Sequence, residues 1–577
     1  MLQVENLSKT YRQKDREIAA LKNISFAVNQ GEILGLVGKS GGGKSTLMKI
    51  LRGMESFDCG KILLDGLTIT PDSGDDVKRA QMSVTAIHLQ RDFALWTESA
   101  VKNVVRRVHS RSTGYEVLPI PEDHNYQEMY QEALYYLRLV GLEKKAHHLA
   151  TVLSGGEKQR LLIARQLARK PKILLLDEPA TMACPATKQE VLDTIKTVNR
   201  ELNLTIIVVS HLPEIHAYLA DRLIWLEGGE IVAEGKPTEI LTRFLAGMGE
   251  VQPLAVRSNP EPLIRVRGLY KRNCLVSTGE VLEVLAMKDI NFDINQGEIT
   301  SIIGNSGGGK TTLLKIMQGV RMPDEGSVFY RHGQNWVDMM VYSPERMEVR
   351  QGLGIMYQEF ALYAGEMIIE QIAYQLGVKG THVVENARAV AEEMGISDKV
   401  LDIIYAMSDM SEEDAKAALE ALGLTRDIFK DLFPRFPATE AEKFAKPVFE
   451  LLSLDPEVLW KLPDQLSGGE KVRASLAILL AARPRVLILD EPFGDIDPIT
   501  LREVSNAIKS INAELGTTIL LVSHHVDFVK EVSHRAIFFE SGAIVADGRP
   551  EDVGNIFLSS CNAPYLKRLE ELFAAGR

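Results

Sequence analysis

Apolar and polar positions along this 577-residue chain follow a pattern that occurs twice. In LKNISFAVNQGEILGLVG (21–38) apolar residues alternate with polar ones, Gln-Gly-Glu follows, and a nearly continuous apolar run comes next. MKDINFDINQGEITSIIG (287–304) repeats this order. Alternation predicts a strand with one buried face, and a continuous apolar run predicts a fully buried strand. Each copy is therefore expected to form a strand, a turn and a buried strand that enters a glycine-rich loop.

The likeness between the two halves continues downstream. The matching segments are LSGGEKQR (153–160) with LSGGEKVR (466–473), ILLLDEP (173–179) with VLILDEP (486–492), and VVSH (208–211) with LVSH (521–524). A fixed order of shared segments marks an internal repeat, so two copies of one α/β unit account for nearly the whole chain. We expect a first domain at 1–235, a join at 236–262 with the composition of a linker or of a short helix followed by an extended segment, and a second domain at 263–577.

The copies differ between the segment around Gln90 or Gln358 and the following LSGGE. From Gln90 to Ser154 is 64 residues, whereas from Gln358 to Ser467 is 109, so the second copy carries 45 additional residues. The region 397–463 has the periodicity of several amphipathic helices. We expect these helices to be interrupted near its prolines, Pro434, Pro437, Pro447 and Pro456.

Composition places the chain among ordinary globular proteins. It is 45% hydrophobic and 25% charged, no apolar run approaches the ~18 residues of a membrane span, and the start MLQVENLSKTY lacks the pattern of a signal peptide. We therefore expect a cytoplasmic protein without direct membrane insertion. The formal charge of −12 argues against broad electrostatic binding to nucleic acid, which needs a basic surface.

The cysteines indicate that the chain itself carries no redox centre. The four cysteines, Cys59, Cys184, Cys274 and Cys561, are scattered and form no C-x-x-C pair. Clustered cysteines are the usual sign of a zinc or iron–sulfur site. Any redox chemistry is therefore expected to belong to a partner.

Two glycine loops predict phosphate binding. GKSGGGKS (38–45) and GNSGGGKT (304–311) both fit G-x-x-x-x-G-K-[ST], in which backbone N–H groups surround nucleotide phosphates. Lys44 and Lys310 are expected to reach the β- and γ-phosphates, and the Ser45 and Thr311 hydroxyls to ligand Mg²⁺. The predicted ATP-binding residues of the loops are Gly38, Ser40, Gly41, Gly43, Lys44, Ser45 and Thr46, and Gly304, Ser306, Gly307, Gly309, Lys310, Thr311 and Thr312.

An apolar strand that ends in Asp-Glu adds the groups that hydrolysis needs. Asp177 and Asp490 are expected to support the metal, and Glu178 and Glu491 to orient and polarise the attacking water. LSGGE adds a second anion-binding element, because its serine and glycines open a helix whose N–H groups and dipole attract a γ-phosphate. The residues concerned are Ser154, Gly155, Gly156, Ser467, Gly468 and Gly469.

The order glycine loop, glutamine, LSGGE, LLLDEP and histidine resembles the ATP-binding cassette (ABC) family over almost the entire chain. The resemblance implies an α/β fold of two tandem P-loop ATPase cassettes, arranged head to tail, with a helical insertion in the second. It implies that each ATP, bound with Mg²⁺, lies between one cassette's glycine loop and the other's LSGGE. By motif, Gln90 and Gln358 resemble the glutamine that senses the metal and γ-phosphate, and His211 and His524 resemble the histidine that contacts the γ-phosphate.

The same resemblance predicts that the two ATP sites are unequal. Tyr11, in LSKTY, falls where the family places an aromatic ring under adenine, whereas the second copy has Asn273 there. Asp497 matches the aspartate that reaches the opposite glycine loop, whereas the first copy has Cys184, a poorer acceptor. In a head-to-tail pair both departures fall on the site of Lys310, so the site of Lys44 with Ser467 is expected to bind ATP more tightly and turn over faster.

Three functions fit a pair of cassettes without membrane segments. Three phrases, VLAMKDINFDINQGEI (284–299), PDQLSGGEKVRASLAILLAARP (463–484) and DEPFGDIDPIT (490–500), together with the insertion, resemble the ATP-carrying subunit of component A. Component A is the activation system of methyl-coenzyme M reductase in methanogenic archaea. This resemblance implies ATP-dependent reductive activation of that enzyme, with iron–sulfur electron carriers as partners. The insertion is then expected to be dispensable for hydrolysis and needed for partner recognition.

The alternatives are a transporter subunit and a translation factor. A fused ATPase subunit of an importer is one, because QEFALYAGEMIIEQI (358–372) follows the pattern by which such cassettes dock membrane partners. A soluble tandem-cassette translation factor is the other. It is disfavoured because the join at 236–262 is short and lacks a basic run.

Overall fold

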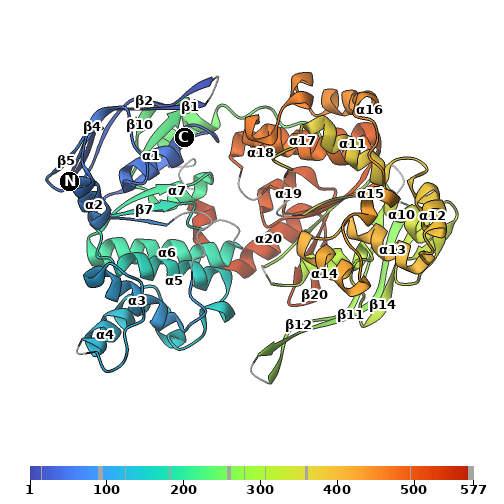
Figure 1. Cartoon of the computed structure of the whole chain (residues 1–577), viewed down its shortest axis with the longest axis horizontal. Helices are drawn as coiled ribbons and strands as arrows, with labels where there is room; N and C mark the ends of the chain where they lie inside the picture. The colour runs from blue at the N-terminus through green and yellow to red at the C-terminus, as the bar shows by residue number, and fades with distance from the viewer. Residues whose placement is uncertain are drawn as a thin grey trace. The chain divides into compact units, whose positions relative to one another are not determined.

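The computed structural model describes residues 1–13, 16–88, 95–123, 125–180, 184–256, 261–277, 280–305, 307–357, 362–493 and 496–568. The chain forms two compact units (Figure 1). The first comprises Met1–Met248 with Asp495–Ile499 and Asn562–Arg577, and the second comprises Gly249–Gly494 with Thr500–Cys561. Among the described helices, none combines the length and the apolar character needed to cross a membrane.

Two sheets form the framework of the first unit. The smaller, antiparallel sheet has the order β2-β1-β4-β5 and consists of β1 (Leu2–Gln13), β2 (Arg16–Val28), β4 (Cys59–Leu64) and β5 (Leu67–Ile69). The larger has the order β10-β9-β3-β8-β7-β6 and consists of β3 (Ile33–Val37), β6 (Thr85–His88), β7 (Ile173–Asp177), β8 (Thr205–Val209), β9 (Arg222–Glu227) and β10 (Glu230–Gly235). Its strands run parallel except β10. Strands β3, β7 and β8 are buried throughout, as their continuous apolar runs predict.

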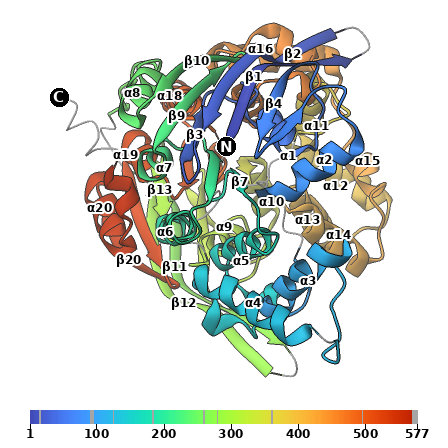
Figure 2. The same ribbon diagram turned by 90° about the vertical axis from the view of Figure 1, so that its left-hand side faces the viewer.

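Helices cover the sheets of the first unit. They are α1 (Lys44–Arg52), α2 (Asp75–Val84), α3 (Ala100–Thr113), α4 (Tyr126–Leu139), α5 (Gly155–Leu167), α6 (Pro185–Leu202), α7 (Pro213–Leu219) and α8 (Pro237–Leu245). Leu47 and Leu51 of α1 share one hydrophobic core with Val4 of β1 and Leu34 of β3, so α1 packs against both sheets. Figure 2 shows α5 and α6 lying side by side. The helix α8 lies within 236–262, and residues 249–256 after it form neither helix nor strand.

The second unit repeats this framework. Its antiparallel sheet, β12-β11-β14-β15, consists of β11 (Pro262–Ser277), β12 (Glu280–Asn295), β14 (Glu325–His332) and β15 (Asn335–Asp338). Its larger sheet, β16-β17-β18-β13-β19-β20, consists of β13 (Ile299–Ile303), β16 (Leu353–Met356), β17 (Val486–Asp490), β18 (Thr518–Val522), β19 (Arg535–Glu540) and β20 (Ala543–Gly548). Read from the opposite edge, this is the strand order of the first unit's large sheet, which confirms the predicted repeat of one α/β unit.

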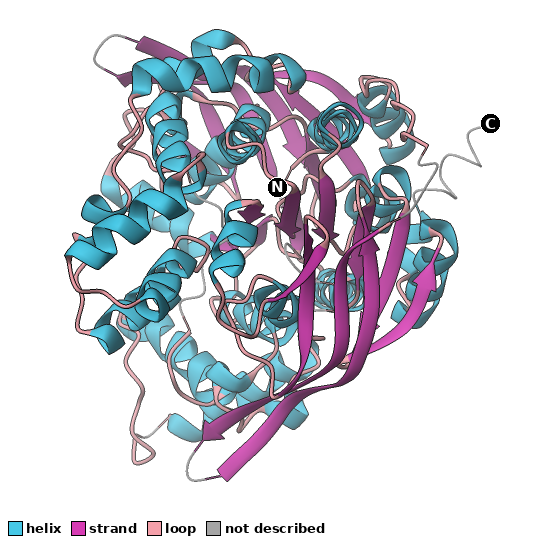
Figure 3. Ribbon diagram, turned by 90° about the vertical axis from the view of Figure 1, so that its right-hand side faces the viewer, coloured by secondary structure: helices cyan, strands magenta, loops and turns pink. Residues whose placement is uncertain are grey.

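The second unit contains more helices than the first. They are α9 (Lys310–Met317), α10 (Pro344–Gln351), α11 (Ile368–Lys379), α12 (Val383–Glu393), α13 (Asp398–Met407), α14 (Glu412–Leu422), α15 (Ile428–Leu432), α16 (Ala438–Leu451), α17 (Gly468–Ala481), α18 (Pro498–Leu515), α19 (Val526–Val532) and α20 (Pro550–Cys561). Helices α13 to α16 lie within 397–463, so the predicted insertion is helical. The helices and the long strands are distinguished by colour in Figure 3.

One expected interruption of the insertion is wrong. Pro434 and Pro437 separate α15 from α16, and Pro456 follows α16, as predicted, but Pro447 lies inside α16. A proline removes one intrahelical hydrogen bond and favours a break. Here the helix continues because its apolar face, including Ala445 and Phe449, is buried, and such packing outweighs local propensity.

The insertion has a hydrophobic core of its own. Side chains of α12 to α15, among them Leu401, Ile404 and Leu432, are buried together with Met347 of α10 and Val378 of α11. This cluster is distinct from the core between the two sheets of the unit. The insertion is thus a packed layer attached to α10 and α11.

Candidate nucleotide-binding and hydrolysis sites

Each glycine loop joins the central buried strand to a helix. Gly43 and Gly309 have φ of 97° and 102°, a left-handed conformation that glycine adopts without strain, and they directly precede α1 and α9. A Cβ at Gly38 would lie 2.0 Å from the Leu226 carbonyl oxygen, so only glycine fits this close approach. Each loop therefore lies at the N-terminus of a helix, where free backbone N–H groups stabilise a bound anion.

The loop lysines are folded back over their own loops. The Lys44 ammonium donates to the carbonyls of Gly38 and Lys39, at 2.7 and 2.8 Å, and only 5% of the residue is exposed. Lys310 makes the equivalent pair of bonds, both 3.0 Å. Burial lowers the pKa of Lys44, and nearby carboxylates oppose the shift. A buried ammonium over a ring of N–H groups is suited to phosphate oxygens.

A hydroxyl and a carboxylate meet at the end of each loop. Ser45 hydrogen-bonds to Asp177 and Thr311 to Asp490. Burial raises the pKa of Asp177 and raises that of Asp490 to about 6, while these hydrogen bonds and the loop lysines oppose the rise. Mg²⁺ prefers such oxygen ligands and is held mostly through one or two protein groups plus substrate phosphates. Of the residues predicted for the metal, Ser45 with Asp177 and Thr311 with Asp490 lie together, and their oxygens suit Mg²⁺.

The first unit holds the Glu178 carboxylate with two neutral donors. The backbone N–H of His211 lies 2.7 Å from Glu178 Oε1, and the Ser210 hydroxyl lies 3.2 Å from Oε2. Glu178 is 7% exposed. The His211 ring lies 3.7 Å from the same carboxylate, and burial lowers the pKa of His211 to about 4. The predicted glutamate and histidine are therefore brought together, with a neutral imidazole.

In the second unit the glutamate lies near the loop lysine and the motif histidine. Glu491 lies 3.7 Å from the Lys310 ammonium and 3.3 Å from His524 Nδ1. His524 is 4% exposed. The same pair of residue types thus occurs at both sites, and in the second unit the glutamate also lies near the loop lysine.

LSGGE opens α5 and α17, as expected. The Ser154 hydroxyl accepts from the Glu157 N–H while the Glu157 carboxylate accepts from the Ser154 N–H, and Ser467 and Glu470 make the same capping box. This arrangement satisfies two of the free donors of the helix start. Both serines are exposed, so the remaining N–H groups face solvent at a helix N-terminus. Whether each LSGGE meets the opposite glycine loop stays a prediction.

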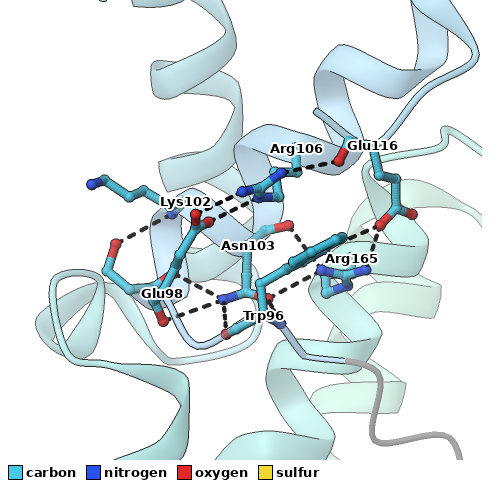
Figure 4. Close-up of polar contacts among 8 residues, drawn as sticks. Trp96, Glu98, Lys102, Asn103, Arg106, Glu116 and Arg165 are labelled. Atoms are coloured by element: carbon cyan, nitrogen blue, oxygen red, sulfur yellow. Dashed lines mark hydrogen bonds and ion pairs between the residues drawn. The ribbon is translucent and has the colours of Figure 1, made fainter. Parts of the chain in front are cut away.

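A polar network fixes α5 against α3. Arg165 of α5 donates to the Asn103 side chain of α3 at 3.1 Å and to the Glu116 carboxylate at 2.9 Å (Figure 4). Arg106 donates to the Glu116 carbonyl at 3.0 Å, and its guanidinium lies 4.3 Å from the centre of the Trp96 ring. Sequence reasoning did not identify these residues. Their effect is to hold the helix that begins at Ser154 in one orientation.

The insertion of the second cassette is bonded to the glycine-loop helix. Arg350 of α10, 1% exposed, donates to the Asp402 carboxylate of α13 at 2.7 Å and to the Gly319 carbonyl after α9 at 2.7 Å. Lys315 of α9 lies 2.6 Å from Asp414 of α14. The insertion thus contacts the end of the helix whose start forms the phosphate loop.

A second buried pair anchors the insertion to the cassette. The Lys379 ammonium of α11 lies 2.9 Å from the Asp409 carboxylate, and both side chains are at least 95% buried. Burial lowers the pKa of Lys379, and Asp409 opposes the shift. Removing the insertion would therefore leave the buried cations Arg350 and Lys379 without their carboxylates.

Several predicted site residues or side chains are not among those that the structure describes. Ser306, Gln90 and Gln358 lie outside the described residues, as does the side chain of Asn273. Tyr11 is half-buried, and its hydroxyl lies 3.3 Å from Glu55, so its predicted stacking under adenine stays a prediction.

The two residues of the predicted Asp497–Cys184 difference are both buried. Cys184 is 5% exposed, and its sulfur lies 3.2 Å from the Thr187 hydroxyl. Asp497, 1% exposed, clusters with the first unit, where its charge raises the pKa of both Lys44 and His211 against their burial. The predicted reach of Asp497 to the opposite glycine loop stays a prediction.

Comparison with known proteins identifies the class. A family model described as ABC transporter matches residues 21–181 and 287–494. An uncharacterized ABC transporter ATP-binding protein of Methanocaldococcus jannaschii is 43% identical over 99% of both chains. The glutathione import ATP-binding protein GsiA of Shigella dysenteriae is 25% identical over 99% of this chain and 89% of its own length.

A solved structure has a similar fold along nearly the whole chain. It is described as a model of ribosome-bound archaeal Pelota and ABCE1, is 20% identical, and covers 96% of this chain and 80% of that one with a TM-score of 0.58. The glycine loops, the Asp-Glu strands and LSGGE, each present twice, define a tandem P-loop ATPase. The chain belongs to the ABC transporter ATP-binding family, whose cassettes bind ATP with Mg²⁺ and hydrolyse it.

Proposed function

We propose that this twin-cassette ATPase couples ATP binding and hydrolysis to the reductive activation of methyl-coenzyme M reductase. The chain acts mechanically: ATP closes the cassettes, hydrolysis reopens them, and this cycle remodels or gates a complex with iron–sulfur electron carriers. The proposal rests on the component A resemblance of 284–299, 463–484 and 490–500. It also agrees with a 43% identical relative in Methanocaldococcus jannaschii, since component A belongs to methanogenic archaea.

The ATP chemistry is assigned to residues of both units. Lys44 and Lys310, with the loop N–H groups, hold the phosphates, while Ser45 with Asp177 and Thr311 with Asp490 hold Mg²⁺. The bound ion neutralises charge that develops on the phosphates. Glu178 and Glu491 orient and polarise water. Gln90 and Gln358 remain assigned to the metal, and His211 and His524 to the γ-phosphate, through the family motif.

The observation that carries the proposed client is the insertion. The first cassette has no counterpart to this layer in its sequence, so a cassette does not need it to bind ATP. The layer has its own core and is fixed by buried pairs to the glycine-loop helix. It also presents apolar side chains to solvent, including Ile403, 41% exposed, and Phe444, 40% exposed. A rigid layer with exposed apolar residues is suited to partner recognition.

Affinity capture from native methanogen cells tests the client. The expected result is recovery of methyl-coenzyme M reductase subunits and iron–sulfur proteins, at higher yield when hydrolysis is blocked. Recovery of hydrophobic membrane subunits in their place would contradict the proposal and favour the importer.

Substitutions on the insertion test its role in recognition better than excision does. Excision would leave Arg350 and Lys379 buried without their carboxylate partners. Ile403→Ser with Phe444→Ser is expected to reduce client capture about tenfold, as loss of interface anchors does, while ATPase activity stays at the parent level. Leu515→Ser is the matched control, since Leu515 is 44% exposed on α18, outside the insertion. Undiminished capture by the double variant would show that the client binds elsewhere.

The second candidate is the ATPase subunit of an importer with separate membrane subunits. The likeness to a glutathione import ATP-binding protein over nearly the full chain favours it. The translation-factor reading has only the fold likeness to ABCE1 in its support, at 20% identity.

A further inference from the structure

A fully buried histidine lies behind the first hydrolytic site. His216 of α7 has an exposed fraction of 0%, and its Nε2 lies 2.9 Å from the carbonyl oxygen of Ser210. A carbonyl only accepts, so Nε2 carries the proton and Nδ1 is the bare nitrogen. Among the described residues Nδ1 has no hydrogen-bond partner. Burial lowers the pKa of His216 to about 4, so the ring is neutral at physiological pH.

This histidine is accommodated at a cost. A Cβ at Gly35, in the middle of β3, would lie 2.3 Å from Leu223 Cδ2 and 2.6 Å from His216 Nδ1, so the Leu223 side chain and the His216 ring together occupy the space that a side chain at residue 35 would fill. Glycine weakens a strand interior, and a buried nitrogen without a partner is unfavourable. Such departures from local rules are a sign of function.

The hydrogen bond of His216 fixes a peptide that holds the glutamate. The Ser210 carbonyl and the His211 N–H belong to one planar trans peptide and therefore point in opposite directions. His216 holds the carbonyl on one side. On the other side the His211 N–H lies 2.7 Å from Glu178 Oε1, with the Ser210 hydroxyl on Oε2. Rotation of this peptide would break both contacts at once.

The second cassette lacks the device. His216 lies five residues after His211, and the residue five after His524 is Val529, which has no donor. The position of Gly35 is taken by Ser301. The carboxylate of Glu491 there lies near Lys310 and His524. The internal repeat thus supplies a natural comparison without the histidine.

We propose that His216 is a positioning residue of the first ATP site. Its Nε2–H holds the Ser210–His211 peptide so that Glu178 stays aimed for water activation. The inference rests on the proposed assignment of Glu178 as the hydrolytic group. Because the hydrogen bond of His216 goes to the peptide that holds Glu178, we expect the residue to affect the catalytic step and to leave ATP affinity unchanged.

The test uses the full chain with Glu491→Gln, so that only the first site turns over. In this background His216→Leu is expected to lower kcat about tenfold, the lower end of what loss of an outer hydrogen-bond partner costs, with KM for ATP within about twofold. His216→Gln, which keeps an N–H donor, should restore most of the kcat. Val529→Ala in a Glu178→Gln background is the matched control, and should leave kcat of the second site unchanged.

Each outcome decides the question. Equal kcat for parent, Leu and Gln variants, or an equal loss in both variants, would overturn the positioning role. If the Leu variant does not fold, His216→Met decides, because methionine adapts to irregular buried space and has no N–H donor: a severalfold fall in kcat with intact ATP binding supports the proposal, and an unchanged kcat overturns it. If Glu178→Gln itself leaves first-site turnover intact, the assignment of Glu178 fails, independently of His216.

Discussion

At the scale of single residues, the proposed hydrolysis depends on two glutamates, the buried Glu178 and the partly buried Glu491. Changing Glu178→Gln together with Glu491→Gln preserves shape but removes both water-activating carboxylates. The double variant should bind ATP with parent affinity and lose turnover by about a hundredfold or more, measured by phosphate release and by binding of a fluorescent ATP analogue.

A matched control guards that prediction. Glu201→Gln makes the same change at the exposed end of α6 and should retain parent activity. If the double variant hydrolyses ATP like this control, the two glutamates are not the hydrolytic groups.

The buried histidine also predicts a pH effect on stability. His216 has its folded-state pKa lowered to about 4, against 6.5 for the free side chain. The unfolded chain therefore takes up the proton first as pH falls, and stability decreases from about pH 6.5 downward. Between about pH 7.5 and pH 5, the parent should lose about 2 kcal/mol more unfolding free energy than His216→Gln, in urea titrations of both proteins. Parallel pH curves would mean that His216 is protonated or exposed in the folded protein.

At the scale of elements, the insertion is the part of the fold with the clearest energetic prediction. Asp402 of α13 is the partner of the buried Arg350. Asp402→Asn keeps the shape but removes the charge, and is expected to reduce the free energy of unfolding by about 3–5 kcal/mol, as breaking a buried pair does.

The neighbouring Asp398, also of α13, provides the control. Its pair with Arg388 spans 3.7 Å and the Asp398 side chain is 54% exposed. Asp398→Asn should therefore cost less than about 1 kcal/mol. Chemical denaturation followed by circular dichroism compares the two, and equal costs would show that the Arg350 pair does not anchor the insertion.

The elements around the ATP motifs could be predicted from the sequence because their signals are local. Continuous apolar runs predicted the buried strands β3, β7 and β8, and LSGGE predicted two capped helix starts. Pro447 was misjudged because burial of the α16 face, a tertiary effect, decides whether that helix continues. The anchoring of the insertion was invisible to sequence reasoning, since Arg350 and Asp402 are 52 residues apart and neither belongs to a motif.

At the scale of the whole molecule, the internal repeat was the strongest guide to fold and site. Lys44, Asp177 and Glu178 were each predicted from a motif and have Lys310, Asp490 and Glu491 as counterparts. The motif order could not reveal His216, because its role depends on where α7 packs against β3. A comparison of the two copies at equivalent positions does single out His216, however, because Val529 stands at its position in the second copy and Ser301 stands at the position of Gly35.

At this scale we propose that the two ATP sites are unequal and that the site of Lys44 accounts for most of the turnover. In the head-to-tail pairing that the family implies, this site keeps Tyr11 and receives Asp497, whereas the other has Asn273 and Cys184. Loss of one stacking contact alone should cost about 1–3 kcal/mol of ATP binding. The first site also has Glu178 held by the Ser210–His211 peptide.

The most direct measurement is the steady-state ATPase rate of Glu178→Gln compared with that of Glu491→Gln, as single variants of the full chain at saturating ATP. Each substitution silences one site and leaves the other as it is. We expect Glu178→Gln to lose most of the activity and Glu491→Gln to retain most of it. Equal losses in the two variants would contradict unequal sites.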